Sequence, residues 1–334
     1  MKLKLSGTLK YLLSVALAAG LLYFAFHGTD WSAFVHGLLS TRWSLIALSV
    51  AASVLALVFR AERWRSLLLT VDRSVSRGKV WHSSNVGNLL NVVIPGAGEF
   101  YRCGKVNRGL GSYDRVLGTV LAERAWDVAS IAVLLVLSVL FGGSSIKPFL
   151  QEHVLAPLSL RMSLGWYAAA GTALVAAMTA AVFIFKDRSS FCAKAASFLK
   201  GILGGLSSFG KVKGKFLFLA YTAGIWLMYI CVTYLTMLAI PGLEHLGFTD
   251  ALFISATGNI ASVIPTPGNI GPYHYLVGLS ISTIYLGSGV MMPEALLCAT
   301  LSHGVHAILL IILGIVSYIK NVTDNSKASG INLV

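Results

Sequence analysis

The sequence predicts an all-α polytopic membrane protein with about six full transmembrane helices and two re-entrant helical hairpins that are related as an inverted repeat. Three observations lead to this prediction. The composition is 56% hydrophobic and only 12% charged, whereas a soluble domain carries roughly 25% charged residues. Long apolar stretches recur along the chain, and two shorter ones are interrupted by proline and glycine.

The long apolar stretches are the predicted spans, because about 20 apolar residues in a helix cross the hydrocarbon core. They cover residues 9–26, 43–60, 116–141, 164–185, 216–240 and 295–319. The first resembles a signal peptide. Its small residues Ala18, Ala19 and Gly20 lie within the apolar run rather than after it, so we expect an uncleaved span.

The charges orient these spans. The net charge is +13, and the basic residues concentrate after the second span and between the fourth and fifth. This pattern is typical of cytoplasmic loops, so we expect a cell inner membrane protein with both termini in the cytoplasm. It indicates contact with anionic headgroups rather than with nucleic acid.

The basic segment 186–215 is either an interfacial amphipathic helix or a solvated loop. We therefore expect the chain to consist of a membrane domain (residues 1–320) and a short polar cytoplasmic tail (residues 321–334).

The two interrupted segments cover residues 79–113 and 249–287. Each places about 15 moderately apolar residues before an Ile-Pro pair, which gives roughly 22 Å of helix, too short to cross with margin. Proline removes a backbone donor and glycine frees the chain, so both segments are predicted to turn back. The predicted breaks are at Pro95, Gly96 and Gly98, and at Pro265, Pro267, Gly268 and Gly271.

The two breaks resemble each other. Gly87-Asn88 precedes the first and Gly258-Asn259 precedes the second, and a full span flanks each hairpin on both sides. With the predicted orientation, the first hairpin enters from the cytoplasm and the second from outside. This is the pattern of an inverted repeat, in which interrupted helices mark the substrate site. A chance match of a short motif is the alternative.

The first break offers an anion site, because a helix start presents free N–H groups and a positive dipole end. Glu99, Arg102 and Lys105 lie near one face of the returning helix. In the functional interpretation, Arg102 holds a phosphate and Glu99 contacts an amine, a sugar or a proton. In the structural one, Glu99 stabilises the helix start and pairs with Arg102.

Further candidate site residues lie in the third span and at the second break. Glu123, Arg124 and Asp127 interrupt an apolar span, so they serve either a lipid or proton path or a structural ion-pair network. Asn269 lies in the second break. His274 follows it and is either a titrating or headgroup-contacting group or a neutral histidine bonded to a backbone carbonyl.

No metal or cofactor is expected. His303 and His306 share a helix face but lack a third ligand at useful spacing, and the glycines after Pro95 follow no strand that would make a nucleotide loop. Four scattered cysteines indicate no redox chemistry. Arg60, Arg63 and Arg65 with Trp64 are predicted to anchor the second span at the membrane interface.

Across residues 10–320 the chain resembles the lysylphosphatidylglycerol synthase transmembrane-region family, which is described as flippase-like. The resemblance rests on RAERWRSL (60–67), PGAGEFYR (95–102), ERAWD (123–127) and IPTPGNIG (264–271). It implies a role in lipid or lipid-linked-sugar pathways. The chain departs from the family at His274, where an acidic residue is usual. The few residues after 319 are also too short for the namesake's soluble synthase domain, so aminoacyl transfer is not expected.

The predicted function is movement of an anionic or aminoacylated phospholipid, or of a polyprenyl-phosphate-linked lipid, between leaflets. The expected partners are membrane lipids and no nucleic acid, with a homodimer or a lipid-modifying enzyme as possible protein partners. Two alternatives remain. One is an integral-membrane enzyme acting on lipid phosphates through Glu99, Asp127 and His274, and the other is a non-catalytic partner of a separate transferase.

Overall fold

The structure is a computed structural model that describes residues 7–107, 113–141, 208–286 and 290–328, together with positions 184, 189 and 193. Every regular element in these residues is helical, which confirms the predicted all-α class. The α-helices are α1 (Gly7–Phe26), α2 (Trp31–Leu39), α3 (Trp43–Leu68), α4 (Arg77–Val93), α5 (Ala97–Asn107), α6 (Tyr113–Phe141), α10 (Lys215–Ala239), α11 (Phe248–Ile260), α12 (Pro272–Leu286) and α13 (Pro293–Ala328). Short 3-10 turns are η2 (Ser208–Lys211), η3 (Ala261–Val263) and η4 (Pro267–Asn269).

Four described helices, α3, α6, α10 and α13, are long and apolar enough to cross a membrane. They correspond to the spans predicted at 43–60, 116–141, 216–240 and 295–319. The span predicted at 9–26 is α1, which bends by 89° into α2, and the two together would make a fifth. The span predicted at 164–185, most of the 186–215 segment and the end of the tail lie outside the described residues. The chain is a multi-pass membrane protein.

The first interrupted segment forms a helical hairpin of α4 and α5. The hydroxyl of Ser76 accepts a hydrogen bond from the Lys79 amide at the start of α4. The helix ends at Val93, just before Pro95, and Gly96 makes the turn with a φ of +83°. Helix α5 then returns against α4, so closely that a Cβ on Gly98 would overlap the carbonyl group of Gly87.

The second interrupted segment folds back in the same way. Helix α11 leads through η3 and η4 into α12, which begins at Pro272, a position where the missing backbone donor of proline costs nothing. Gly268, Asn269 and Gly271 all have positive φ in this break. A Cβ on Gly258 would lie 2.9 Å from side-chain carbons of both Tyr273 and Val277, so α11 packs tightly on α12.

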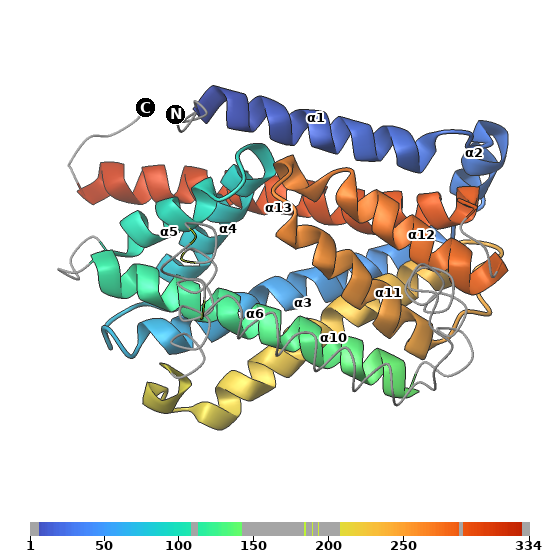
Figure 1. Cartoon of the computed structure of the whole chain (residues 1–334). Coiled ribbons are helices and arrows are strands. Elements are labelled where there is room, and N and C mark those ends of the chain that lie inside the picture. Colours follow the sequence, from blue (N-terminus) through green and yellow to red (C-terminus); the bar gives the residue numbers. More distant parts are fainter. Residues whose placement is uncertain are drawn as a thin grey trace.

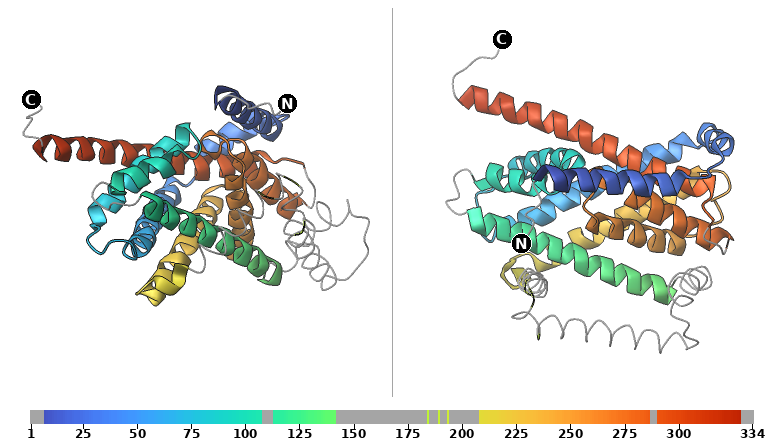
Figure 2. Two further views of the ribbon diagram at one scale, coloured as in Figure 1. Left: turned by 60° about the vertical axis from the view of Figure 1, so that its left-hand side comes forward. Right: turned by 45° about the horizontal axis from the view of Figure 1, so that its top comes forward.

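The element order is the same in both halves: a span, a hairpin and a second span. The first unit is α3, α4–α5 and α6, and the second is α10, α11–α12 and α13. In Figure 1 the hairpin of α4 and α5 lies toward one end of the molecule, the hairpin of α11 and α12 toward the other, and their breaks face each other between them. Helix α3 packs along α10. Helix α13 runs past both hairpins, as Figure 2 shows from two directions.

The predicted interfacial anchor around Trp64 is wrong. Trp64 and Arg63 are completely buried, and α3 continues to Leu68 instead of ending at Arg60. The Trp64 indole donates a hydrogen bond of 3.0 Å to the Thr119 hydroxyl on α6, and the Arg102 guanidinium lies 4.5 Å from the centre of its ring. Helices α5 and α6 therefore cover the end of α3 that was expected to meet the headgroups.

Candidate functional site

The two helix breaks share one cavity of about 350 Å³. Its lining includes Pro95 and Gly96 from the first break and Pro265 and Gly268 from the second. The helical arms of both hairpins and the helices α3, α6, α10 and α13 contribute the rest. The breaks also touch, because a Cβ on Gly268 would lie 3.4 Å from the carbonyl oxygen of Val92. The volume falls in the range of about 300–1,000 Å³ that is typical of small-ligand sites.

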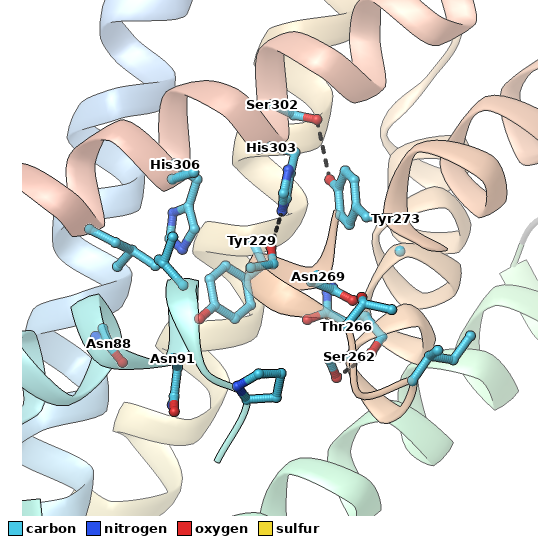
Figure 3. Close-up of a pocket in the computed structure, with 18 of the residues that line it drawn as sticks. Asn88, Asn91, Tyr229, Ser262, Thr266, Asn269, Tyr273, Ser302, His303 and His306 are labelled. Carbon is cyan, nitrogen blue, oxygen red and sulfur yellow. Dashed lines mark hydrogen bonds between the residues drawn. The ribbon is translucent and has the colours of Figure 1, made fainter. Parts of the chain in front are cut away.

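Most polar groups in the cavity wall are uncharged amides and hydroxyls. Figure 3 shows them projecting from the two hairpins and from α10 and α13. They include Asn88, Asn91, Tyr229, Ser262, Thr266 and Asn269. Such side chains donate and accept hydrogen bonds without carrying charge, so they suit a polar headgroup with several hydroxyl or phosphoryl oxygens.

Hydrogen bonds from the wall hold both breaks in place. The Asn91 side-chain oxygen accepts from the Gly98 amide at 2.8 Å, which satisfies a free donor at the start of α5. The His303 ring donates from Nε2 to the Gly268 carbonyl oxygen at 2.8 Å. The Tyr273 and Ser302 hydroxyls lie 3.2 Å apart (Figure 3). Helix α13 thus fixes the shape of the second break through two side chains.

Charged side chains occupy one part of the wall. Glu99 and Arg124, both predicted site residues, line the cavity and form an ion pair of 2.8 Å. Arg60 lines it too and donates to the Tyr229 hydroxyl at 3.0 Å. The structure therefore pairs Glu99 with Arg124 rather than with Arg102, although Glu99 does lie in the first turn of α5 as expected.

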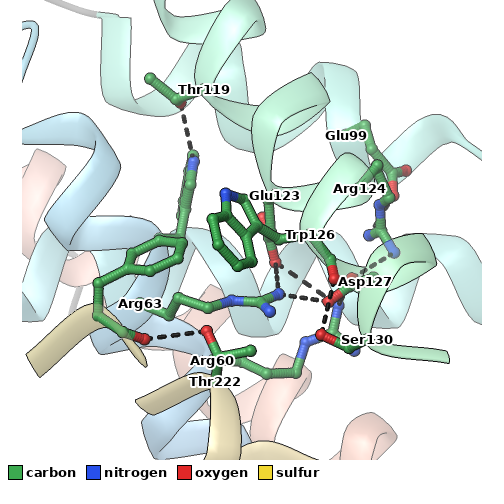
Figure 4. Close-up of polar contacts among 12 residues, drawn as sticks. Arg60, Arg63, Glu99, Thr119, Glu123, Arg124, Trp126, Asp127, Ser130 and Thr222 are labelled. Carbon is green, nitrogen blue, oxygen red and sulfur yellow. Dashed lines mark hydrogen bonds and ion pairs between the residues drawn. The ribbon is translucent and has the colours of Figure 1, made fainter. Parts of the chain in front are cut away.

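Behind this wall lies a buried charge cluster centred on Glu123, which is 1% exposed (Figure 4). Its carboxylate lies 2.7 Å from the Arg102 guanidinium, 3.6 Å from Arg60 and 3.7 Å from Arg63. Arg102 is itself buried and does not line the cavity among the described residues. Three helices, α3, α5 and α6, are joined at this one carboxylate.

Asp127 extends the cluster toward the cavity. Arg63 donates a hydrogen bond to it, and Arg124 and Arg60 lie 3.7 and 3.9 Å away. Asp127 thus pairs with Arg124 one turn away on α6, and it shares the partners Arg60 and Arg63 with Glu123. Together the cavity wall and the cluster hold four arginines (Arg60, Arg63, Arg102 and Arg124) against three carboxylates (Glu99, Glu123 and Asp127), a surplus of one positive charge.

His274 lies beside the cavity rather than in its lining. It is buried, its Nδ1 atom has no hydrogen-bond partner, and its ring centre is 5.1 Å from that of His303 and 6.1 Å from that of Phe26. His303, rather than His274, binds a backbone carbonyl. Asn269 does line the cavity, and it adopts a φ of +62°.

Sequence reasoning missed several wall residues, namely Arg60, Asn91, Tyr229, Thr266 and His303. For Arg60 the sequence does contain a predictive pattern. Arg60 and Arg63 share one helix face at i, i+3, and Glu123 and Asp127 share another at i, i+4. Because the two faces carry opposite charges, they predict an ion-pair contact between the two helices. The others carry no charge or were considered only as metal ligands. In the described parts of the chain, no group of three His, Cys, Asp or Glu residues is arranged to hold a metal ion.

Fold and site together define a multi-pass helical membrane protein in which two interrupted hairpins enclose a polar cavity next to a buried charge cluster. The model of the lysylphosphatidylglycerol synthase TM region matches residues 11–314, and the chain belongs to this family. The match includes all four sequence segments on which the resemblance rested. Comparison with curated proteins and with solved structures found no match to the chain.

Proposed function

We propose that this protein is a lipid translocase, which moves an anionic or aminoacylated phospholipid or a polyprenyl-phosphate-linked lipid between the leaflets of the cell inner membrane. One observation carries the proposal: two interrupted hairpins meet at a polar cavity within an apolar helical protein. Moving a charged headgroup through hydrocarbon is costly, and a polar cavity that replaces its water lowers that cost while the acyl chains stay in lipid. The family match supports a lipid-related role.

In this proposal the arginines of the wall hold the phosphate. Arg60 and Arg124 present guanidinium groups to the cavity, and guanidinium matches the geometry of phosphate oxygens. Glu99 positions Arg124 and accepts a hydrogen bond from the headgroup. Arg102, Glu123 and Asp127 act from behind, because their ion pairs keep the wall arginines in place.

The transport cycle would use the two halves as an inverted repeat. The repeated order of span, hairpin and span supports this, as does the position of the hairpins toward opposite ends of the molecule (Figure 1). With both termini in the cytoplasm, one hairpin enters from each side, and relative movement of the halves opens the cavity to one leaflet at a time. We expect no cofactor and propose membrane lipids as the partners, with a homodimer or a lipid-modifying enzyme as the protein partner.

The first test is transport by the purified chain in liposomes, measured with fluorescent anionic phospholipids and a membrane-impermeant quencher. Wild-type vesicles should move lipid faster than empty ones. Arg124→Gln should slow this movement about tenfold, because a hydrogen bond to a charged group contributes about 1.5–3 kcal/mol. Arg124 is 44% exposed, so the variant is expected to fold.

The matched control for this test is Arg42→Gln. Arg42 is 56% exposed, forms a single ion pair with Glu244, and lies outside the cavity lining. It should transport at the wild-type rate. If wild-type vesicles move no lipid faster than empty vesicles, the translocase proposal fails. If Arg124→Gln matches wild type while transport is intact, the assignment of the phosphate site to this wall is wrong.

A further inference from the structure

The charge balance of the cavity favours a net negative headgroup. Its wall carries two guanidinium groups, Arg60 and Arg124, and one carboxylate, Glu99, which is already paired with Arg124. The two carboxylates behind the wall are already paired. Glu123 and Asp127 both contact Arg60 and Arg63, and each contacts one further arginine. An added phosphate would neutralise the surplus positive charge, whereas an added ammonium group would increase it.

In the part of the cavity wall that the second hairpin forms, several buried polar groups have no hydrogen-bond partner within the described protein. The Ser255 and Thr266 side chains are only 3% and 4% exposed, they line the cavity, and neither hydroxyl forms a hydrogen bond as donor or acceptor. The side-chain oxygen of Asn269 is also buried and has no hydrogen-bond partner. Buried polar groups are almost always hydrogen-bonded, because leaving one unpaired costs about 1–3 kcal/mol. These three therefore point to hydroxyl groups of a ligand.

We infer that the lipid carried by this cavity has an anionic headgroup with free hydroxyl groups next to its phosphate, such as glycerol phosphate or a sugar phosphate, and that it is not aminoacylated. The inference rests on the proposed function and narrows its substrate class. The phosphate binds at Arg60 and Arg124, and the hydroxyls bind at Ser255, Thr266 and Asn269 of the second hairpin.

Aminoacylation would disturb both the charge balance of the cavity and the hydroxyl contacts to the second hairpin. A lysyl ester adds two ammonium groups, while Glu99 is the only carboxylate among the described residues of the wall. It also uses one of the hydroxyls that the second hairpin is arranged to bind. An ammonium group without a carboxylate partner, away from bulk water, is strongly disfavoured.

The test is direct lipid binding to the full-length protein in nanodiscs of phosphatidylcholine. The competing lipids are phosphatidylglycerol, a polyprenyl phosphoryl sugar, phosphatidic acid, which lacks headgroup hydroxyls, and lysyl-phosphatidylglycerol. At least one of the first two lipids should bind about tenfold more tightly than phosphatidic acid. The difference in affinity between that lipid and lysyl-phosphatidylglycerol should be larger still. Whichever of the two binds better identifies the lipid source. Free glycerol phosphate in the buffer should compete only at much higher concentration, since it lacks the lipid tail.

Two variants locate the hydroxyl site. Thr266→Val and Ser255→Ala should reduce the preference for phosphatidylglycerol or the sugar lipid over phosphatidic acid severalfold. Thr236→Val is the matched control, because the Thr236 hydroxyl is buried on α10, donates to the Val232 carbonyl and lies outside the cavity lining. Its lipid preference should equal that of wild type.

The inference is overturned if lysyl-phosphatidylglycerol binds as tightly as the best hydroxylated lipid, if no lipid binds above the phosphatidylcholine background, or if free glycerol phosphate binds as tightly as the lipid. Because binding is measured without transport, the two proposals fail separately. The expected order of affinities without lipid movement in liposomes supports the inference and contradicts the translocase. Rapid movement of lysyl-phosphatidylglycerol in liposomes supports the translocase and contradicts the inference.

Discussion

Replacing Glu123 by alanine is expected to lower the free energy of unfolding by about 3–5 kcal/mol, because removing one partner of a buried ion pair leaves uncompensated charge. Glu123 is 1% exposed, and the guanidinium groups of Arg63 and Arg102, also buried, depend on it. The measurement is unfolding of the purified protein in mixed micelles with increasing denaturing detergent, followed by circular dichroism.

The control for this prediction is Glu244→Gln. Glu244 forms an ion pair of 3.0 Å with Arg42, but their side chains are 35% and 56% exposed. Exposed pairs of this kind contribute at most about 1 kcal/mol. Equal losses for the two variants would contradict the burial of Glu123 in the charge cluster that Figure 4 shows.

Gly98→Ala is expected to destabilise the first hairpin by about 1–3 kcal/mol, in the range of other overpacking substitutions. The added Cβ would overlap the Gly87 carbonyl group and lie 2.8 Å from the Asn91 side chain. The Gly87 carbonyl is backbone and cannot rotate away, so α4 and α5 must separate. The same unfolding assay measures the loss, and reduced lipid transport should accompany it because Glu99 and Asn91 are adjacent to the contact.

Gly104→Ala provides the comparison within the same helix. A Cβ at Gly104 meets nothing within 4 Å, and alanine is favoured over glycine in a helix by about 0.5–1 kcal/mol. This variant should be as stable as wild type or slightly more so. A stable Gly98→Ala protein would mean that α4 and α5 do not pack against each other as in this structure.

The sequence was sufficient for the features that depend on local chemistry. Apolar runs of sufficient length predicted the described spans, and Pro95 and Pro265 marked the two helix breaks, since a missing backbone donor and a free glycine disrupt a helix in any environment. The carboxylates at 99, 123 and 127 were recognised as site candidates because charge is rare in apolar spans.

Features that depend on which helices meet could not be predicted in the same way. Arg63 and Trp64 have the composition of an interfacial anchor, and only their packing against α5 and α6 shows that they are buried. Glu99 pairs with Arg124, 25 residues away, rather than with its near neighbour Arg102. His303 on α13 gains its role from the Gly268 carbonyl in the break of the second hairpin. None of these three contacts follows from the spacing of the residues along the sequence.

Cross-linking in native membranes tests whether the two helix breaks meet at one cavity. The four native cysteines are replaced, and cysteines are introduced at Val92 and Asn269, which both line the cavity. A short bifunctional thiol reagent should then join the two positions within one chain and stop transport, while each single-cysteine variant stays unlinked. If each cysteine reacts with the reagent in its single variant but the two never become linked in the double variant, the breaks lie apart and do not share a cavity.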